Sequence, residues 1–328
     1  MISQLHVHIL ENQDPLFLGL LHRQLNNCIQ LTTGKIHQDL PHYQMLVAGR
    51  PDPAALSHSP ALQWLVIPFA GVPVETQGLM QNYPTISVHN LHHNARPTAE
   101  LALALLFAAA KNLLPYDQAL RKSDWTPRYE GNPGLLLHGC PVCIFGFGAV
   151  GKEVGRLCSA LDMEVTGVRA GAQPGEIWKG IPVLPTALLQ KQLVKTQILI
   201  LTVPLTENTR GLIAKEELCM LRKPSVLINI SRGQVVEEEA LYEALFDGTL
   251  SAAGLDVWYA YPSDRPSRRS TQPSRYPFFK LPNVVLSPHR GGASDQTEVL
   301  RAEALAHLIH AASKGEELWN RVDLDRGY

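Results

Sequence analysis

Two short segments, far apart in the chain, each place one chemically active side chain at the end of an apolar run. In segment 228–236 (INISRGQVV) that side chain is Arg232, and in segment 286–292 (LSPHRGG) it is His289. In an open parallel sheet, ligands bind just beyond the carboxyl ends of the strands. An arginine and a histidine delivered to that edge would clamp a carboxylate and move a proton.

The elements that position these residues follow an alternating pattern. Short apolar runs alternate with longer segments of helical spacing, which predicts βαβ units and parallel sheets. The predicted strands are residues 6–10, 45–48, 64–67, 86–88, 142–146, 164–168, 197–203, 226–230, 252–257 and 284–286. This is more than one ordinary doubly wound sheet, and 328 residues suit about two domains.

We therefore predict an α/β fold with two Rossmann-like domains, one flavodoxin-like and one dinucleotide-binding. Residues 1–97 with 294–328 are assigned to a discontinuous substrate-binding domain, and residues 98–293 to the dinucleotide-binding domain. Segment 98–111 (TAELALALLFAAAK) is apolar nearly all round, which predicts a buried helix that begins after Pro97. Segment 125–139 is predicted to be a loop, and segment 298–313 a closing helix.

Composition excludes several classes of protein. The chain has 29 basic and 30 acidic residues, which argues against nucleic acid or an anionic membrane as partner. Its longest apolar stretch, 101–110, is shorter than the roughly 20 residues that span a bilayer. Residues 1–14 lack the pattern of a signal peptide, so we expect a cytoplasmic protein.

The five cysteines do not form a metal-binding pattern. Cys140 and Cys143 make a CxxC, but no second pair or His-x-x-x-His partner accompanies it. We interpret them as reduced, buried core residues and predict no metal site.

A GxGxxG motif occupies Gly146, Phe147, Gly148, Ala149, Val150 and Gly151. It follows an apolar run and opens a helical pattern, the context that a dinucleotide-binding turn requires. The glycines permit a tight turn, close approach of a pyrophosphate, and close packing of helix on strand. The motif predicts NAD or NADP at the helix N-terminus, and the alternative is a glycine-rich turn without a ligand.

The next strand, 164–168, ends on Arg169. A carboxylate at this place would bind the ribose hydroxyls of NAD and repel a 2′-phosphate, whereas an arginine can pair with the phosphate bidentately. Arg169 therefore favours NADP over NAD. In the alternative interpretation it stacks on adenine or faces solvent.

Several further motifs occur in order: TVPLT at 202–206 with Asn208 and Thr209, NISRG at 229–233, AGLDV at 253–257 and SPH at 287–289. With the GxGxxG they resemble the D-isomer-specific 2-hydroxyacid dehydrogenases. That family includes glyoxylate/hydroxypyruvate reductases, phosphoglycerate and D-lactate dehydrogenases and, more distantly, formate dehydrogenases. Upstream, segments 69–72 and 94–112 resemble the family's substrate loop and interdomain helix more loosely.

The resemblance implies roles for individual residues. Arg232 would bind the carboxylate and 2-oxo group of the substrate, and His289 would protonate the carbonyl oxygen as hydride arrives. Asp256 would hold the nicotinamide carboxamide. Further residues implied to line the cofactor are Thr202, Val203, Pro204, Ile230 and Gly291, and those implied for the substrate are Ala70, Gly71 and Val72. The structural alternatives are a solvated arginine, a structural histidine and a capping aspartate.

The chain departs from the family pattern at Tyr261. The family usually has there a glutamate that hydrogen-bonds the catalytic histidine and raises its pKa. We place Tyr261 with Arg232 and His289 in the catalytic set. We also expect the pKa of His289 to stay near about 6.5, or below it if the ring is buried.

A second departure is segment 263–280, which is longer than the family's usual link and rich in arginine. Its arginines are Arg265, Arg268, Arg269 and Arg275. The segment would either cover the site and favour a substrate with more than one negative charge, or form a solvated loop at a dimer edge. We prefer the second interpretation.

The leading functional hypothesis is an NAD(P)-dependent reductase of a small 2-oxo acid, acting as a homodimer. Tyr261 motivates a second hypothesis, a cofactor-binding regulator or corepressor-like protein with weak catalysis. Formate dehydrogenase-like chemistry is a third and weaker one, because the glutamine expected beside the histidine is absent.

Overall fold

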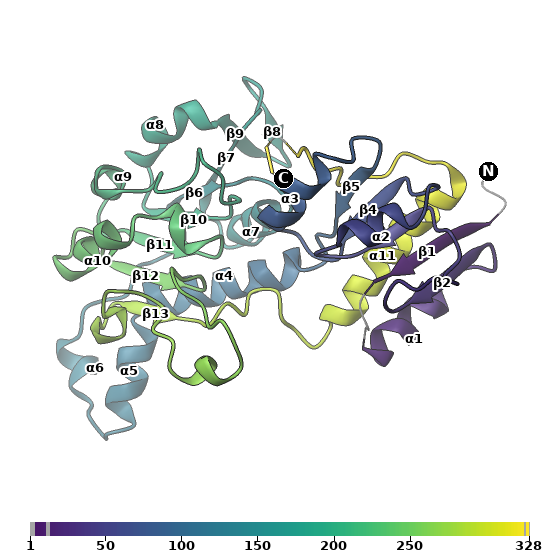
Figure 1. Cartoon of the computed structure of the whole chain (residues 1–328). Helices are drawn as coiled ribbons and strands as arrows, with labels where there is room; N and C mark the ends of the chain where they lie inside the picture. The colour runs from purple at the N-terminus through teal and green to yellow at the C-terminus, as the bar shows by residue number, and fades with distance from the viewer. Residues whose placement is uncertain (1–3, 11–13, 325, 328) are drawn as a thin grey trace. The chain divides into compact units, whose positions relative to one another are not determined.

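The computed structural model describes residues 4–10, 14–324 and 326–327 (Figure 1). The chain divides into two compact units, residues 1–94 with 293–328 and residues 95–292. The predicted α/β class with parallel sheets is confirmed.

The first unit is built on a five-stranded parallel sheet in the order β2-β1-β3-β4-β5, which is the flavodoxin-like order. Its strands are β1 Leu5–Ile9, β2 Ile29–Thr33, β3 Met45–Val47, β4 Trp64–Ile67 and β5 Ser87–Asn90. Its helices are α1 Pro15–Gln24, α2 Pro53–Ser57, α3 Val74–Met80 and α11 Thr297–Lys314. The first and last helices of the chain, α1 and α11, pack together against one face of this sheet.

Alternation along β3 shows how the two faces are covered. Met45 and Val47 pack in one apolar cluster with residues of α1 and α11. Leu46, between them, packs in a second cluster with residues of α2 and α3. Side chains of a strand alternate between faces, so this unit is a three-layer αβα sandwich.

The second unit contains an eight-stranded sheet in the order β13-β12-β11-β10-β6-β7-β9-β8, parallel except for the β8–β9 hairpin. Its strands are β6 Pro141–Phe145, β7 Glu164–Arg169, β8 Ile177–Trp178, β9 Ile181–Pro185, β10 Ile198–Leu201, β11 Val226–Asn229, β12 Ala252–Leu255 and β13 Val284–Leu286. Its α-helices are α4 Ala95–Ala110, α5 Leu113–Leu120, α6 Thr126–Glu130, α7 Ala149–Ser159, α8 Leu189–Leu193, α9 Lys215–Met220 and α10 Glu238–Phe246. The 3₁₀ turns are η1 Thr186–Leu188, η2 Gly233–Val235, η3 Pro266–Arg269 and η4 Phe278–Lys280.

The two faces of this sheet also carry different helices. Residues of α4 and α7 share an apolar cluster with Val142, Ile144 and Ile200. Residues of α8, α9 and α10 share another with Cys143 and Leu199, which point to the opposite side. Gly254 on β12 allows α4 to approach closely, because a Cβ there would lie 2.7 Å from the Cβ of Leu105.

Three strands and one helix differ from the sequence-based expectation. Strands β2, β8 and β9 were not predicted, and β2 is only partly buried, so its apolar pattern is weak. The prolines of β9, Pro182 and Pro185, argue against a central strand, and β9 lies beside a two-residue edge strand. The loop predicted over 125–139 contains α6.

Helix α4 is buried as predicted, with ten of its residues in the core, but it begins at Ala95. Pro97, predicted to precede it, lies in the first turn, where a missing N–H costs no hydrogen bond. Cys140 and Cys143 are buried as predicted, and burial raises the pKa of Cys143 to about 12.

Over the described residues, no single helix has both the length and the apolarity to cross a membrane. The bent pair α4 and α5 meets that test together by length and composition only. In the same part of the chain, no group of three or more His, Cys, Asp and Glu side chains is arranged to hold a metal ion.

Candidate active site

The predicted site residues of the second unit lie at the carboxyl edge of its sheet. They follow six neighbouring parallel strands, β13, β12, β11, β10, β6 and β7. The chain runs from β6 outward to β7 on one side and returns through β10 on the other, so a topological switch point lies between β6 and β10. Parallel α/β sheets bind ligands at such a point.

The glycine motif forms the turn from β6 into α7. Gly146 has φ +107°, and a Cβ there would lie 2.5 Å from the carbonyl carbon of Thr202, so only glycine fits. The hydroxyl of Thr202 donates to the Gly146 carbonyl at 2.6 Å and ties the turn to β10. Gly151 is buried against the same carbonyl, which brings α7 close to the sheet.

Gly148 has a different role, because a Cβ there would meet nothing within 4 Å. It is the N-cap of the eleven-residue α7, and no side chain of the described residues caps this helix. The turn is thus an open cradle at a helix N-terminus, which fits a pyrophosphate. Ala149 and Val150 form the first turn of α7, where their backbone lies at this end.

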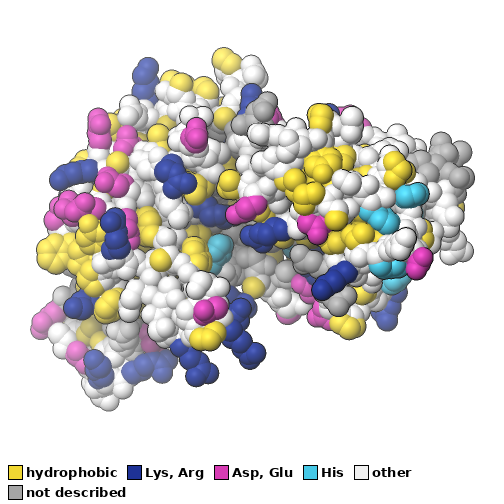
Figure 2. All heavy atoms as spheres, viewed as in Figure 1, with side chains coloured by type: hydrophobic (Ala, Val, Ile, Leu, Met, Phe, Trp, Pro, Cys, Tyr) yellow, Lys and Arg dark blue, Asp and Glu magenta, His cyan; other side chains and the backbone are white. Residues whose placement is uncertain are grey.

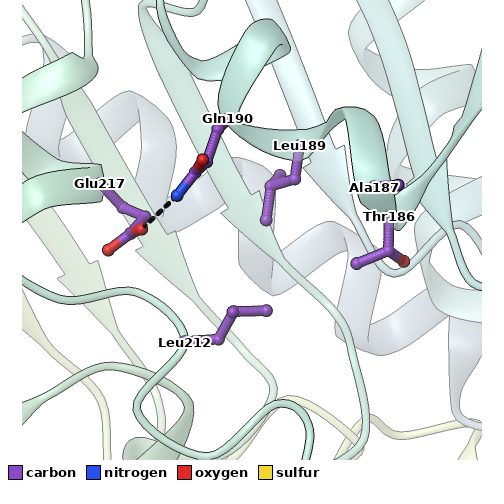
Figure 3. A pocket seen from close by; sticks show the side chains of 6 residues that line it. All are labelled: Thr186, Ala187, Leu189, Gln190, Leu212 and Glu217. Carbon is purple, nitrogen blue, oxygen red and sulfur yellow. Dashed lines mark hydrogen bonds between the residues drawn. The ribbon is translucent and has the colours of Figure 1, made fainter.

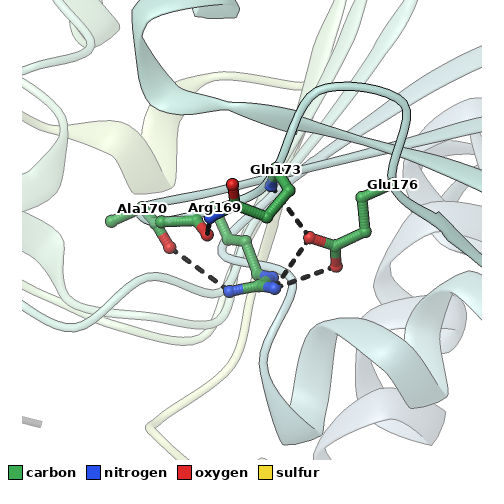
Figure 4. A network of polar contacts seen from close by, with 5 residues as sticks. Arg169, Ala170, Gln173 and Glu176 are labelled. Atoms are coloured by element: carbon green, nitrogen blue, oxygen red, sulfur yellow. Dashed lines mark hydrogen bonds and ion pairs between the residues drawn. The ribbon is translucent and has the colours of Figure 1, made fainter.

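At the end of β7, Arg169 forms an ion pair that the sequence did not predict (Figure 4). Its Nη2 donates to both oxygens of Glu176 at 2.9 Å. Glu176 also accepts from the backbone N–H of Gln173 at 3.1 Å. These contacts, with that of Arg169 first, hold the pKa of Glu176 below its usual value.

The turn after β11 carries Ile230, Ser231 and Arg232. Buried Asn229 shapes it: its side-chain oxygen accepts from the N–H and hydroxyl of Ser231, and its amide donates to the Arg232 carbonyl. Arg232 itself is exposed and donates through Nη1 to the Ser231 carbonyl at 2.7 Å. Its guanidinium therefore keeps donors for a bound anion.

Asp256 follows β12 and is almost fully buried, at 1% exposure. One of its oxygens accepts from the Ser287 hydroxyl and the Arg290 N–H, and the other from the Gly291 N–H at 2.8 Å. The carboxylate thereby fixes the turn that carries His289. A carboxylate has about four acceptor positions, so these three bonds leave capacity for one more donor.

His289 lies in that turn with φ +57°, a left-handed conformation that is uncommon for a residue with a side chain. Burial lowers the pKa of His289, and the positive charge of Arg232 lowers it further, while Asp256 acts in the opposite direction. This is the direction expected from the sequence.

Tyr261 packs on the histidine, with ring centroids 5.5 Å apart and planes at 53°. Its phenol oxygen accepts from the Trp258 N–H at 3.0 Å, so this oxygen is held by the backbone. Gly233 admits the Trp258 carbonyl where a Cβ would collide with it. The turns after β11 and β12 are therefore packed together, which brings Arg232, Tyr261 and His289 into one group.

The arginine-rich segment 263–280 is anchored through buried Glu238 at the start of α10. This carboxylate accepts from the Ser274 hydroxyl, the Arg275 N–H and the Arg275 side chain. Although burial alone would raise the pKa of Glu238, these hydrogen bonds hold it below its usual value. Arg265, Arg268 and Arg269 are exposed, and Lys and Arg side chains are conspicuous on this part of the second unit in Figure 2.

Two further features concern a loop of the first unit and a pocket of the second. Ala70, Gly71 and Val72 belong to the first unit, in the loop between β4 and α3, where the Asn90 amide donates to the Ala70 carbonyl at 2.7 Å. A pocket beside η1 and α8 is lined by Thr186, Ala187, Leu189, Gln190, Leu212 and Glu217 (Figure 3). The Gln190 amide donates to Glu217, and no predicted site residue lines this pocket.

Residues 103–291 match the family model described as D-isomer specific 2-hydroxyacid dehydrogenase, NAD binding domain. The chain belongs to this family. The resemblance seen in the sequence is thus confirmed, and residues 103–291 correspond to the family's NAD-binding domain.

Curated relatives include two dehydrogenases of this family. A glyoxylate reductase of Korarchaeum cryptofilum is 34% identical over 226 residues, which cover 67% of this chain and 63% of that protein. A glycerate dehydrogenase of Methylorubrum extorquens is 28% identical over 267 residues, or 80% and 79% of the two chains. Thus the match spans less than two thirds of the first of these relatives.

Solved structures support the fold over nearly the whole chain. A D-isomer specific 2-hydroxyacid dehydrogenase of Xanthobacter autotrophicus, in complex with NADPH, has a TM-score of 0.80 at 22% identity and covers 99% of this chain and 100% of its own. An NADPH-dependent glyoxylate/hydroxypyruvate reductase of Sinorhizobium meliloti has a TM-score of 0.77 at 21% identity, with the same coverage.

In this member of the family, three predicted cofactor residues follow β10. Thr202 is bound to the glycine turn, Val203 is buried with its N–H beside Gly146, and the Pro204 carbonyl accepts from Thr209. The sequence did not reveal Glu176, because no family motif includes it. It also did not reveal that Lys152, directly after the glycine motif, would lie close enough to lower the pKa of Glu176.

Proposed function

We propose that this 2-hydroxyacid dehydrogenase interconverts a small 2-oxo acid and its D-2-hydroxy acid with NAD or NADP. The observation that carries the proposal is the group formed by Arg232 and His289, at the ends of β11 and β13 on either side of β12. Arg232 supplies a forked cation for the substrate carboxylate and 2-oxo group. His289 supplies a proton at the carbonyl oxygen, or removes one in the reverse direction.

The cofactor position follows from the open turn at Gly148. Gly146, Gly148, Ala149, Val150 and Gly151 would receive the pyrophosphate at the start of α7. Thr202, Val203, Pro204 and Ile230 would border the cofactor from the neighbouring strands, and the free acceptor position of Asp256 suits a carboxamide N–H, with Gly291 beside it. When bound, the nicotinamide supplies or accepts the hydride.

Charge coupling between Arg232 and His289 links substrate binding to protonation of the histidine. Without substrate, desolvation and then the Arg232 charge lower the pKa of His289. A substrate carboxylate paired with Arg232 would compensate that charge and thereby favour the imidazolium. Substrate binding would therefore help His289 to acquire the proton that reduction needs.

Glyoxylate and hydroxypyruvate are the first substrates to test, because relatives with these activities share the fold and the NAD-binding domain. The assignment of Ala70, Gly71 and Val72 to substrate binding remains a proposal made from the sequence. The domain roles assigned to residues 1–97 with 294–328 and to 98–293, action in the cytoplasm and a homodimer remain proposals made from the sequence.

A panel of 2-oxo acids and formate with each cofactor tests the proposal, by following the absorbance of the reduced nicotinamide. We expect turnover of a 2-oxo acid, strong loss of kcat/KM in Arg232→Ala and His289→Gln, and unchanged cofactor binding in both variants. Equal activity in these variants and wild type would contradict the assigned roles.

One observation favours the regulator as a second candidate. Tyr261 replaces the usual glutamate, and the pKa of His289 is lowered rather than raised. A regulator would bind NAD(P) with no turnover of any acid in the panel, so the same assay separates the two functions.

A further inference from the structure

The ion pair between Arg169 and Glu176 changes what the ribose end of the cofactor site offers to a ligand. A free arginine at the end of β7 would present its whole fork to a 2′-phosphate. Here Nη2 is engaged by both oxygens of Glu176, and Nη1 donates weakly to the Ala170 carbonyl at 3.4 Å (Figure 4).

Glu176 is held in this position by the fold. It directly precedes β8, which pairs with β9, and β9 pairs with β7 so that Pro185 lies opposite Arg169. The Gln173 N–H fixes one carboxylate oxygen. With side chains 38% and 25% exposed, Arg169 and Glu176 are both partly accessible to a ligand.

A second cation lies near the pair. Lys152, in the first turns of α7, is close enough for its charge to lower the pKa of Glu176. Its Nζ also lies 5.8 Å from the centre of the Trp178 ring, which places it beside the β8 hairpin. Glu176 therefore lies near at least two cations, Arg169 and Lys152, and its charge offsets part of the positive charge that an incoming phosphate would meet.

NAD and NADP differ in the group that they present to this region, a 2′-hydroxyl in NAD and a 2′-phosphate in NADP. A carboxylate accepts hydrogen bonds from the ribose hydroxyls of NAD and repels the 2′-phosphate of NADP, whereas an unpaired arginine favours the phosphate. The Arg169–Glu176 pair offers acceptors to the hydroxyls while part of the arginine fork remains engaged.

We propose that Glu176 is the specificity-determining residue of this site, which restrains Arg169 and Lys152 and so keeps NAD competitive with NADP. This deepens the proposed function and rests on the cofactor site assigned there. It also revises the sequence-based preference for NADP, which considered Arg169 alone.

Calorimetric titration of the full chain tests the proposal with two nucleotide fragments, adenosine 2′,5′-bisphosphate and 5′-AMP, which differ by the 2′-phosphate. Removing one exposed carboxylate beside a phosphate is expected to tighten bisphosphate binding by about five- to tenfold in Glu176→Gln. Binding of 5′-AMP should change by less than about twofold, since the lost partner is only a hydroxyl acceptor.

Two further variants keep the result interpretable. Glu176→Ala also removes the carboxylate but keeps no amide in its place. It should shift the ratio of the bisphosphate affinity to the 5′-AMP affinity in the same direction as Glu176→Gln. Glu153→Gln removes a carboxylate of the same helix that is paired with Arg156 instead of Arg169, and should leave the ratio unchanged. The ratio of kcat/KM for NADPH to that for NADH should follow the ratio of the affinities.

The outcomes separate this inference from the function on which it rests. Wild-type protein that binds neither fragment refutes the cofactor site and this inference with it. Wild-type binding with an unchanged ratio in both Glu176 variants refutes the inference alone. Weaker bisphosphate binding in those variants also overturns it, because Glu176 would then orient Arg169 for the phosphate.

Discussion

The replacement of Tyr261 by glutamate tests whether the missing carboxylate controls the acidity of His289. Reduction needs the imidazolium form. Because the pKa of His289 is lowered from 6.5, at most about one molecule in ten carries that proton at about pH 7.5. Wild-type kcat/KM for reduction should therefore fall as pH rises through a value below 6.5.

The size of the expected change follows from the contact between the two rings. If a glutamate charge lies at the 5.5 Å ring separation, its attraction for the imidazolium is about 3 kcal/mol at an effective dielectric constant of about 20, or about two pKa units. The Tyr261 side chain is 45% exposed, so solvent and salt should reduce this to about one unit. The imidazolium fraction at about pH 7.5 would then rise by about five- to tenfold, because the wild-type pKa lies below 6.5.

The assay is the pH profile of kcat/KM for reduction of glyoxylate or another accepted 2-oxo acid. Tyr261→Glu should move the break upward by about one unit, while Tyr261→Gln, of matched length and without charge, should not. A break that stays in place in the glutamate variant, or moves equally in both variants, would refute the electrostatic argument.

Three further predictions concern the supports of the site. Gly151→Ala places a methyl group against the Gly146 carbonyl, so we expect about 1–3 kcal/mol of destabilisation in urea unfolding and weaker cofactor binding by calorimetry. The control is Gly78→Ala, where the added methyl group meets nothing within 4 Å, and equal losses in both variants would contradict the prediction. Glu238→Ala leaves three donors of Ser274 and Arg275 without their acceptor. Tryptic cleavage in 263–280 should therefore be faster than in wild type, and the free energy of unfolding should fall by about 1–3 kcal/mol. Exposed Glu237→Ala is the control, and equal cleavage rates in the two variants would contradict the prediction. Burial, Arg301 and His92 lower the pKa of His93 to about 4, so the folded state binds fewer protons than the unfolded state between pH 6.5 and 4. The contribution of His93 to the free energy of unfolding should be complete above pH 6.5, and the free energy should be lower by about 2 kcal/mol at about pH 5. An equal decrease between these pH values in His93→Gln would contradict this prediction.

The parts of the fold that the sequence predicted are those governed by strong local patterns. The core strands β10 and β11 are continuous apolar runs because helices cover both of their faces. Strands β2 and β9 lack that pattern, the first because it is partly exposed and the second because prolines are tolerated near the sheet edge. The strands that the prediction missed, β2, β8 and β9, all lie at or next to a sheet edge.

The glycine turn was predictable for a similar reason. Gly146 and Gly151 are required because the backbone is crowded within a short stretch of chain and against one neighbouring strand. The spacing of the glycines alone therefore predicts the turn. The partner of Arg169 is Glu176, seven residues downstream, and it is placed there by the hairpin that brings the chain back beside β7. Nothing in the spacing of the sequence indicated which side chain would lie next to Arg169. The pairing of Asp256 with the turn at 287–291 likewise requires the sheet order.

Tyr261 and Glu176 act at opposite ends of the proposed cofactor site, and each determines the charge beside a functional side chain. Near His289, an expected negative charge is absent, because Tyr261 contributes a neutral ring whose oxygen is bound to Trp258. Near Arg169, an unexpected negative charge is present in Glu176. The family motifs specify where the chain bends and where the ligand-binding groups begin, but these two side chains set the local charge. Proton donation and cofactor choice should therefore vary independently, since changing Glu176 leaves the group around His289 intact and changing Tyr261 leaves the Arg169 pair intact.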